Sequence, residues 1–283
     1  MGVAQNDLIY DVGLFNGDDT AYYLFRGYRV VALDANPIMI ERARSRFSEE
    51  IATGRLTLLN IGISEKEGLD TFWISEQPEW SSFDRAIASR DSTEHKPISV
   101  PIVRFSNVIE QYGIPHYLKI DIEGNDKLCI QSIRGMTLPK YISVETECVG
   151  DNEILSDERA LEVLTALHHL GYKQFKLINQ FNFTAARSGV ARGFLNRVIH
   201  SCANGRLRVL GLSSVAAKFT DAGKLSRINF SFHSGSSGPW GNDTPGSWTT
   251  FEKSKDLYLQ TRHSYFRKPC PLYSFWYDWH ATF

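Results

Sequence analysis

Short apolar runs alternate with amphipathic segments over the first 178 residues. Each run is continuous and ends at a polar residue or a glycine, which is typical of a buried strand. The expected strands are 8–12, 29–33, 56–59, 117–121, 141–145 and 172–178. The clearest helices between them are 18–25, 36–53 and 157–170, the second of which starts at an Asn-Pro pair. Strand and helix alternate, so the pattern predicts a doubly wound, mostly parallel α/β sheet.

The pattern changes twice along the chain. Two more exposed strands are expected at 70–75 and 98–103, with a polar loop between them. Beyond residue 180 the periodicity weakens, and we interpret 185–226 as an insertion or cap and 233–283 as an aromatic-rich tail. A last strand is expected near 227–232. We therefore predict a single domain over 1–283, with its core at about 8–178.

Composition and charge narrow the class of protein. The chain has 283 residues, 31 Lys+Arg against 32 Asp+Glu, and a net charge of -1. This balance argues against a broad nucleic-acid or polybasic membrane surface. No apolar run approaches the ~20 residues of a membrane span, and Met1 to Asp7 shows no signal peptide. The four cysteines form no CxxC pair, so a cytoplasmic protein with reduced thiols is expected.

The candidate chemistry lies where the predicted strands end, because ligands of open α/β sheets bind beyond the carboxyl ends of the strands. Gly13 and Gly17 allow a sharp turn and close approach to a ligand. Asp34, at the end of the second strand, can hold a ribose diol. These features alone fit either a dinucleotide or S-adenosylmethionine.

The charge of the first turn favours the methyl donor. A pyrophosphate needs bare N–H groups and no nearby anion. Here Asp11, Asp18 and Asp19 surround the turn, and no glycine completes a GxGxxG motif. Carboxylates would repel two phosphates and attract an ammonium and a sulfonium.

The chain resembles the FkbM-type S-adenosylmethionine-dependent methyltransferases over about 8–178. The motifs are Asp-Val-Gly-Leu-Phe-Asn-Gly-Asp-Asp-Thr at 11–20, Leu-Asp-Ala-Asn-Pro at 33–37, Asn-Ile-Gly-Ile-Ser at 60–64, Leu-Lys-Ile-Asp-Ile-Glu-Gly at 118–124 and Tyr-Ile-Ser-Val-Glu at 141–145. The 118–124 phrase is the most specific. The resemblance implies a Rossmann-like class I fold, a seven-stranded sheet with an antiparallel last strand. It also implies, mostly, O-methylation of sugar or natural-product hydroxyls.

The resemblance also implies roles for individual residues. The residues expected to bind the methionine end of the cofactor are Asp11, Gly13, Asn16, Gly17, Asp18 and Thr20. Asp34 is expected to take the ribose hydroxyls, with Asn36 near them, and Ile61 and Gly62 are expected to flank the adenine. Asp121 is expected to face the methyl group, with Glu123 beside it.

A hydroxyl acceptor requires a general base, because its proton must leave when it is methylated. The candidates are Asp121, Glu123, Glu145, His233 and His280. Glu123 could instead be a helix N-terminal anion, and the two histidines could be ordinary hydrogen-bonded residues. Asp121, Glu123 and Glu145 could also bind Mg²⁺, which prefers oxygen ligands. Strand-end carboxylates are equally what cofactor binding needs.

The acceptor is expected to be a small molecule or a carbohydrate. Trp240, Trp248, Trp276 and Trp279 could stack on sugar rings, or could pack the tail or a homodimer contact. A nicotinamide-dependent oxidoreductase and a non-catalytic cofactor-binding scaffold are the alternatives. A DNA base methyltransferase is disfavoured, because the chain lacks the Asn/Asp-Pro-Pro-aromatic motif that is usual in the amino-methylating enzymes. The cytosine C5 enzymes use a Pro-Cys nucleophile, but the one Pro-Cys pair of this chain lies in the tail and not after the fourth strand.

Overall fold

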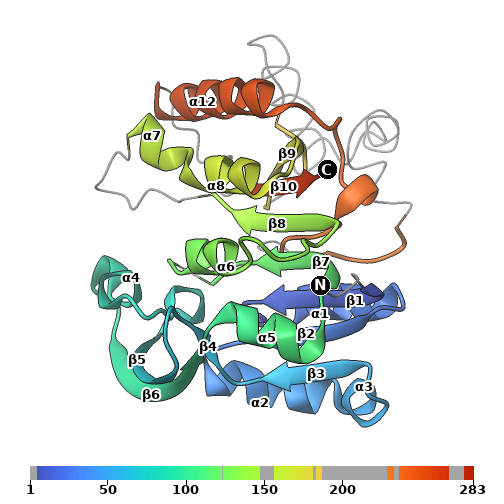
Figure 1. Cartoon of the computed structure of the whole chain (residues 1–283). Helices are drawn as coiled ribbons and strands as arrows, with labels where there is room; N and C mark the ends of the chain where they lie inside the picture. Colours follow the sequence, from blue (N-terminus) through green and yellow to red (C-terminus); the bar gives the residue numbers. More distant parts are fainter. Residues whose placement is uncertain are drawn as a thin grey trace, which may run out of the picture. The chain divides into compact units, whose positions relative to one another are not determined.

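A computed structural model describes most of the chain (Figure 1). The described residues are 5–122, 124–146, 156–180, 183–186, 228–232, 236–267 and 277–283. The chain divides into two compact units, Met1–Glu145 and Thr146–Phe283. The expectation of a single domain stays a prediction.

The first unit is built on five parallel strands. They are β1 (Gln5–Val12), β2 (Arg29–Leu33), β3 (Leu56–Leu59), β7 (Pro115–Ile120) and β8 (Tyr141–Glu145). Their order is β3-β2-β1-β7-β8, and every neighbouring pair is parallel. The strand order therefore reverses between β1 and β7. Figure 1 shows their carboxyl ends on the left.

Continuous apolar runs form the buried strands of this sheet. Leu8, Ile9, Tyr10 and Val12 of β1 are all 2% exposed or less, which is typical of a parallel strand covered on both faces. The strands predicted from these runs are confirmed with shifts of a few residues at their ends.

The helices of the first unit follow the strands. They are α1 (Asp18–Phe25), α2 (Pro37–Arg46), α3 (Ser48–Ala52), α5 (Phe105–Tyr112) and α6 (Asp126–Ser132). The side chain of Asn36 accepts a hydrogen bond from the N–H of Ile38, so the predicted helix start is confirmed. The single helix expected over 36–53 is instead divided at Phe47, whose φ of -116° and ψ of 32° interrupt it.

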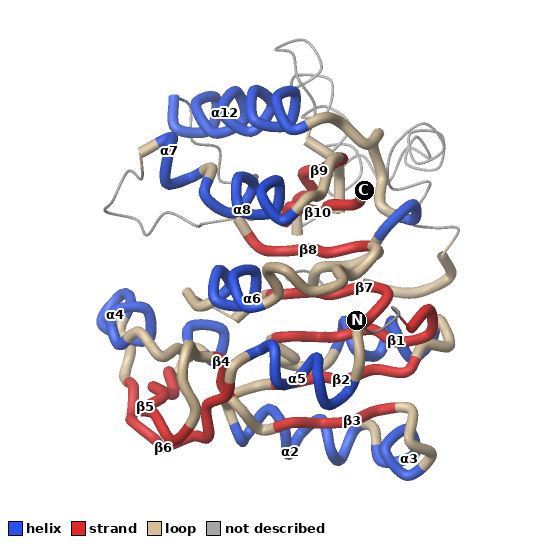
Figure 2. The backbone as a smooth tube through the Cα atoms, in the orientation of Figure 1, coloured by secondary structure: helices blue, strands red, loops and turns tan. Residues whose placement is uncertain are grey.

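A small second sheet is inserted in the first unit. It contains β4 (Gly62–Ile63), β5 (Gly68–Ser75) and β6 (His95–Val103), in the order β4-β6-β5. β5 and β6 are antiparallel (Figure 2). Between them lie η1 (Pro78–Trp80), α4 (Arg85–Ala88) and η2 (Arg90–Ser92). The two exposed strands are thus confirmed, and the polar loop between them contains short helical turns.

The second unit pairs two antiparallel strands with helices. Its elements are α7 (Asp157–Ala160), α8 (Glu162–Leu170), β9 (Gln174–Asn179), η4 (Gly241–Asp243), α12 (Phe251–Arg267) and β10 (Tyr277–Thr282). β10 runs antiparallel to β9. Phe175, Tyr258 and Trp279 are fully buried in its core.

The strands together confirm the predicted fold class. Five parallel strands and one antiparallel pair make a seven-stranded, mostly parallel α/β set, the pattern implied by the resemblance to Rossmann-like class I methyltransferases. The set includes the antiparallel last strand that the resemblance implied.

The position of the last strand differs from the prediction. Residues 228–232 alternate apolar and polar residues, yet they form no strand. Asn229 has a φ of 54°, in the left-handed region, which breaks an extended chain. The last strand is β10, inside the segment expected to be a tail. Residues 187–227, most of the predicted insertion or cap, lie outside the described residues.

Candidate functional site

The backbone of the β1 turn lies directly against the end of β7. The N–H groups of Gly13 and Leu14 both donate to the carbonyl of Leu33, and the N–H of Asp121 donates to the carbonyl of Val12. Gly13 has a φ of 89°, and a Cβ added there would lie 1.7 Å from the carbonyl oxygen of Asp121. Only glycine fits both the conformation and the space. The three strand ends are therefore joined where the sheet order reverses, the place at which such folds bind ligands.

A buried lysine lies at the centre of this junction. Lys119 is 3% exposed, and its Nζ lies 2.5 Å from the carbonyl oxygen of Gly13 and 3.1 Å from Oδ1 of Asp11. Oδ2 of Asp121 is 3.9 Å away and Oδ2 of Asp19 is 4.0 Å away. Burial alone would lower the pKa of Lys119, but the carboxylates of Asp11, Asp121 and Asp19 outweigh it and raise that pKa.

The junction is negatively charged overall. Three carboxylates surround one ammonium, which gives a formal charge of -2. Sequence reasoning placed Lys119 in a motif but gave it no role. A lysine within an otherwise apolar buried strand is the signal that could have identified it, since lysine is seldom fully buried unless it is paired.

Asp11 and Thr20 are partners of each other. The Thr20 hydroxyl donates a 2.6 Å hydrogen bond to Oδ2 of Asp11, and both residues are fully buried. They form the inner wall of the junction. Their direct contact with a cofactor stays a prediction.

The carboxylate of Asp34 is held by two backbone donors. The N–H of Phe15 donates to Oδ2 and the N–H of Asn36 donates to Oδ1, each at 2.8 Å. A carboxylate oxygen has two lone pairs, so each oxygen can still accept another hydrogen bond. Burial raises the pKa of Asp34 to about 6, against the lowering effects of these two N–H groups and of Lys119.

The loop after β2 is fixed by two asparagines. Asn36 is buried and caps α2, as described above. Asn60 donates through Nδ2 to the carbonyls of Asp34 and Ala35, at 2.9 and 3.2 Å. Asn60 was not among the residues with a predicted role. Its amide links the end of β3 to the Asp34 loop and so supports the position of that carboxylate.

Asn16 and Asp18 close the turn that precedes α1. Oδ1 of Asn16 accepts from the N–H of Asp18, and Nδ2 of Asn16 donates to Oδ2 of Asp18. Arg46 donates to both Asp18 Oδ1 and the Asn16 carbonyl at 2.8 Å. Gly17 has a φ of 80°, and a Cβ there would lie 2.8 Å from the ring of Phe47. Two of the predicted contact residues, Asn16 and Asp18, therefore bind each other and Arg46 of α2.

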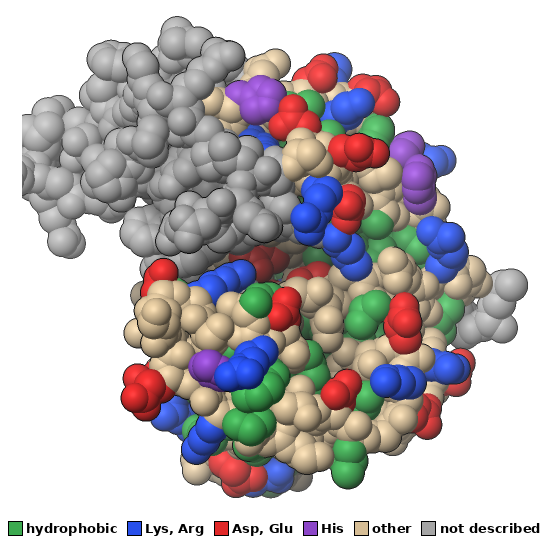
Figure 3. All heavy atoms as spheres, turned by 90° about the vertical axis from the view of Figure 1, so that its left-hand side faces the viewer, with side chains coloured by type: hydrophobic (Ala, Val, Ile, Leu, Met, Phe, Trp, Pro, Cys, Tyr) green, Lys and Arg blue, Asp and Glu red, His purple; other side chains and the backbone are tan. Residues whose placement is uncertain are grey.

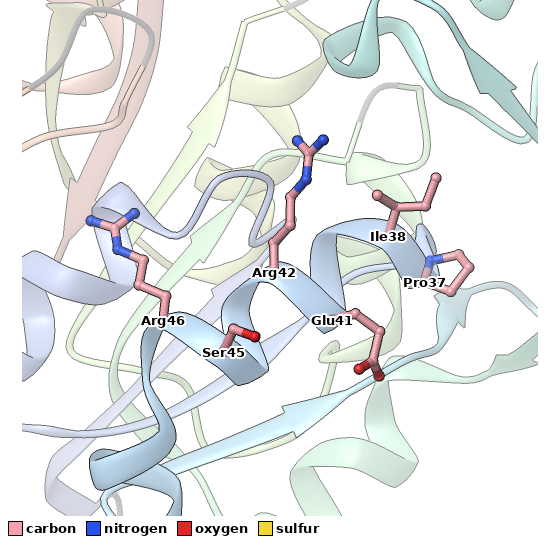
Figure 4. A pocket seen from close by; sticks show the side chains of 6 residues that line it. All are labelled: Pro37, Ile38, Glu41, Arg42, Ser45 and Arg46. Carbon is pink, nitrogen blue, oxygen red and sulfur yellow. The ribbon is translucent and has the colours of Figure 1, made fainter.

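An open hollow lies along α2, next to this turn (Figure 4). It is lined by Pro37, Ile38, Glu41, Arg42, Ser45 and Arg46. In Figure 4, Arg42 and Arg46 project to the same side of the helix. The strand-end carboxylates are not among its lining residues, so we do not take the hollow as the centre of the site.

Phe83 occupies the place next to the predicted adenine residues. A Cβ added to Gly62 would lie 2.1 Å from Cζ of Phe83, so the ring packs directly on the glycine that follows Ile61. Further along the same insertion, Cδ1 of Ile87 in α4 would lie 3.1 Å from a Cβ on Gly124. The inserted segment therefore borders both Gly62 and Gly124. No short-range sequence pattern indicates this contact.

Two of the candidate bases in the first unit, Asp121 and Glu145, lie at strand ends in the described part of the chain. The side chain of Asp121 is 22% exposed at the end of β7. The next N–H, of Ile122, donates to Oδ1 of Asp126, whose pKa is raised to about 6 by burial and then by the charge of Asp121. Glu145 ends β8 and is half-buried. Glu123 and His233 lie outside the described residues.

His280 lies in β10 of the second unit. It is 1% exposed, and burial together with the charge of Lys176 lowers its pKa to about 3. It is therefore a neutral imidazole at physiological pH, and its role as a base stays a prediction. Within the described ranges, no three His, Cys, Asp or Glu side chains gather so as to hold a metal ion. The set of Asp121, Glu123 and Glu145 includes an undescribed residue and stays a prediction.

A match to a family model shows which family the chain belongs to. The model of the methyltransferase FkbM domain matches residues 11–173. The chain belongs to the FkbM methyltransferase family. The match covers β2, β3, β7 and β8, the last two residues of β1 and every strand-end residue described above, and the expected resemblance is confirmed.

Solved structures similar to this FkbM protein are distant. A bacterial CtHen1 methyltransferase domain is 10% identical, with 65% of this chain and 84% of that chain covered and a TM-score of 0.36. Phosphoethanolamine N-methyltransferase 2 of Haemonchus contortus, in complex with S-adenosyl-L-methionine, is 9% identical. The match covers 99% of this chain and 49% of that chain, with a TM-score of 0.38. Precorrin 8w decarboxylase of Methanobacterium thermoautotrophicum is 16% identical. The match covers 62% of this chain and 69% of that chain, with a TM-score of 0.34. These similarities are too weak to carry a functional argument, and no curated protein matches the chain.

One face of the FkbM protein agrees with its neutral composition. Figure 3 views the side towards which the carboxyl ends of the first unit's strands point, and Lys/Arg and Asp/Glu side chains are interspersed over its described part. Among the described residues, no helix combines the length and the apolar character needed to cross a membrane.

Proposed function

We propose that this FkbM protein is an S-adenosylmethionine-dependent methyltransferase that O-methylates a hydroxyl of a sugar, a glycan or a natural-product small molecule. The observation that carries the proposal is the Asp34 carboxylate, fixed by the N–H groups of Phe15 and Asn36 beside the β1 turn. A carboxylate oriented in this way can accept both hydroxyls of a ribose. The family supports methyl transfer in general.

The charge of the junction favours this cofactor over a dinucleotide. Asp11, Asp19 and Asp121 leave a formal charge of -2 after Lys119 is counted. α1 carries Asp18 and Asp19 in its first turn, and its N-cap is a glycine with no side-chain hydrogen bond. An anionic pyrophosphate would meet these carboxylates, whereas an ammonium and a sulfonium are attracted to them. The residues present therefore fit S-adenosylmethionine.

Binding and orientation would be the main tasks of the protein. The cofactor supplies an already activated methyl group. Asp34 would hold its ribose, Ile61 and Gly62 with the ring of Phe83 would border its adenine, and the turn at Gly13 would face its methionine end. Such fixed positioning of donor and acceptor can supply a large part of the rate enhancement.

The acceptor proton needs a group to receive it. Asp121 is the candidate with the best position, because it directly follows β7 beside the Gly13 turn and keeps a partly exposed carboxylate. Glu123, His233 and His280 remain further candidates. A magnesium ion held by Asp121, Glu123 and Glu145 would make the acceptor proton easier to remove, because the ion would lower the pKa of the hydroxyl. If treatment with a chelator leaves turnover unchanged, magnesium has no part in the reaction.

A comparison of two ligands tests the proposal. S-adenosylhomocysteine should raise the melting temperature of the protein, because a ligand that binds only the folded state stabilises it, and NAD should leave it unchanged. Asp34→Asn should abolish the shift, whereas Asp70→Asn, an exposed carboxylate on β5, should retain it. Stabilisation by NAD alone would show a nicotinamide enzyme instead. Binding without methylation of any hydroxylated compound in a broad acceptor panel would favour the scaffold alternative.

A further inference from the structure

We propose that Lys119 is a positioning residue: its ammonium holds the Gly13 carbonyl and, through the 13–15 turn, keeps Asp34 in its binding orientation. The inference rests on the proposed function, because it concerns the same cofactor site. It assigns a role to a buried charge that neither cofactor binding nor proton removal uses directly.

The contacts form one continuous chain. Nζ of Lys119 donates to the Gly13 carbonyl at 2.5 Å. Gly13 and Leu14 bind the Leu33 carbonyl through their N–H groups, and Phe15, the next residue, donates its N–H to Asp34. Phe15 has a φ of 48°, an unfavourable conformation for a non-glycine residue, so the turn needs external support to keep it.

The burial of Lys119 in β7 indicates that its charge has a structural role. Its neighbours in β7, Tyr117, Leu118 and Ile120, are 1% exposed or less. Burying an ammonium among such residues is costly unless it is paired and hydrogen-bonded. Here Asp11 pairs with it at 3.1 Å, and the same Asp11 accepts from Thr20 of α1. The ammonium thus connects β7, the β1 turn and α1 at one point.

A methionine at this position would keep the length of the side chain but remove the donor. The Gly13 carbonyl would lose the ammonium contact, and Asp11 would keep the hydrogen bond from Thr20. The turn should then sample other conformations, and the Phe15 N–H should leave Asp34 part of the time. Loss of orientation at Asp34 would weaken ligand binding without any loss of a direct ligand contact.

Two readouts of Lys119→Met test this role. Amide hydrogen exchange of Phe15 in the ligand-free protein should be at least tenfold faster than in the wild type. The dissociation constant for S-adenosylhomocysteine should rise at least tenfold. Tyr10→Phe is the matched control, because it removes a partly buried 2.6 Å hydrogen bond to Gly113 from β1, outside the site. It should lower stability but change the affinity and the Phe15 exchange less than twofold.

The outcomes separate the positioning role from the proposed function. If wild-type protein does not bind S-adenosylhomocysteine, the proposed function fails, while the exchange rate of Phe15 still tests Lys119. If Lys119→Met binds as tightly as Tyr10→Phe and Phe15 stays protected, the positioning role is wrong. Lys119→Gln and Lys119→Arg are measured in parallel in case the methionine variant does not fold. The Arg variant, which keeps donor and charge, should retain more Phe15 protection than Gln, and the reverse order would overturn the proposal.

Discussion

A β-carbon placed on Gly13 would lie 1.7 Å from the carbonyl oxygen of Asp121. The two residues directly follow β1 and β7, more than 100 positions apart in the sequence, and their backbones meet at the point where the sheet order reverses. No side chain can separate them. The close approach brings the turn that would face the cofactor next to the carboxylate that would face its methyl group.

Replacement of Gly13 by alanine should therefore damage both folding and binding. The left-handed backbone alone costs about 1 kcal/mol for alanine, and displacement of the Asp121 carbonyl should bring the total to roughly 3 kcal/mol or more. Gly54→Ala is the matched control, because Gly54 also has a positive φ, 71°, with nothing within 4 Å of an added Cβ. Urea unfolding should show about 1 kcal/mol for Gly54→Ala. Equal losses in the two variants would contradict the contact.

Thr20 should matter for stability more than for affinity. Its hydroxyl donates to the buried Asp11 carboxylate, and loss of a hydrogen bond to a charged group costs about 1.5–3 kcal/mol. Thr20→Val should lower the free energy of unfolding by that amount. Its dissociation constant for S-adenosylhomocysteine, measured well below the melting temperature, should change less than threefold. A tenfold weaker affinity would show instead that Thr20 contacts the ligand, as the family resemblance implied.

Cofactor binding should weaken in mild acid because of Asp34. Burial raises the pKa of this carboxyl to about 6, so it is ionised and able to accept two hydroxyls above that pH and protonated below it. S-adenosylhomocysteine should bind about tenfold more weakly at pH 5 than at pH 7. Asp70→Asn should show the same pH dependence as the wild type. An affinity that stays flat from pH 7 to pH 5 would contradict the role of Asp34.

His280 should make the fold sensitive to acid. Its pKa is lowered to about 3 in the folded chain, so below about pH 6.5 the unfolded state takes up a proton that the folded state does not. Its contribution to stability is therefore lost as the pH falls, on the order of 2 kcal/mol between pH 6.5 and pH 5. His280→Gln should lose less stability over this range than the wild type. His169→Gln, which alters an exposed side chain, serves as the control, and identical slopes for all three proteins would contradict the burial of a neutral His280.

Local patterns were sufficient for most of the fold. Continuous apolar runs predicted the five parallel strands, and the Asn36-Pro37 pair predicted the start of α2. The last strand was misplaced because 228–232 has a strand-like alternation. Its pattern does not show that Asn229 adopts a left-handed conformation. β10 was not predicted, because an aromatic-rich segment is as typical of a packed tail as of a strand.

The candidate site was predicted in part, since residues at strand ends can be placed from topology alone. Asp34 and Asp121 follow from this rule. The support around them does not, because it depends on which side chains meet across the fold. Lys119 with Asp11, Asn60 with the Asp34 loop, and Phe83 with Gly62 are all long-range contacts. Conversely, Asp11 and Thr20 looked available for a ligand in the sequence, and only the structure shows that they bind each other.

A crystal structure of the protein with S-adenosylhomocysteine is the most direct test of the central claim, that the strand ends of the first unit bind the methyl donor. We predict that both ribose hydroxyls will lie on the Asp34 carboxylate and that the sulfur will lie on the side of Asp121. A ligand whose ribose lies elsewhere, or whose sulfur points away from Asp121, would contradict it.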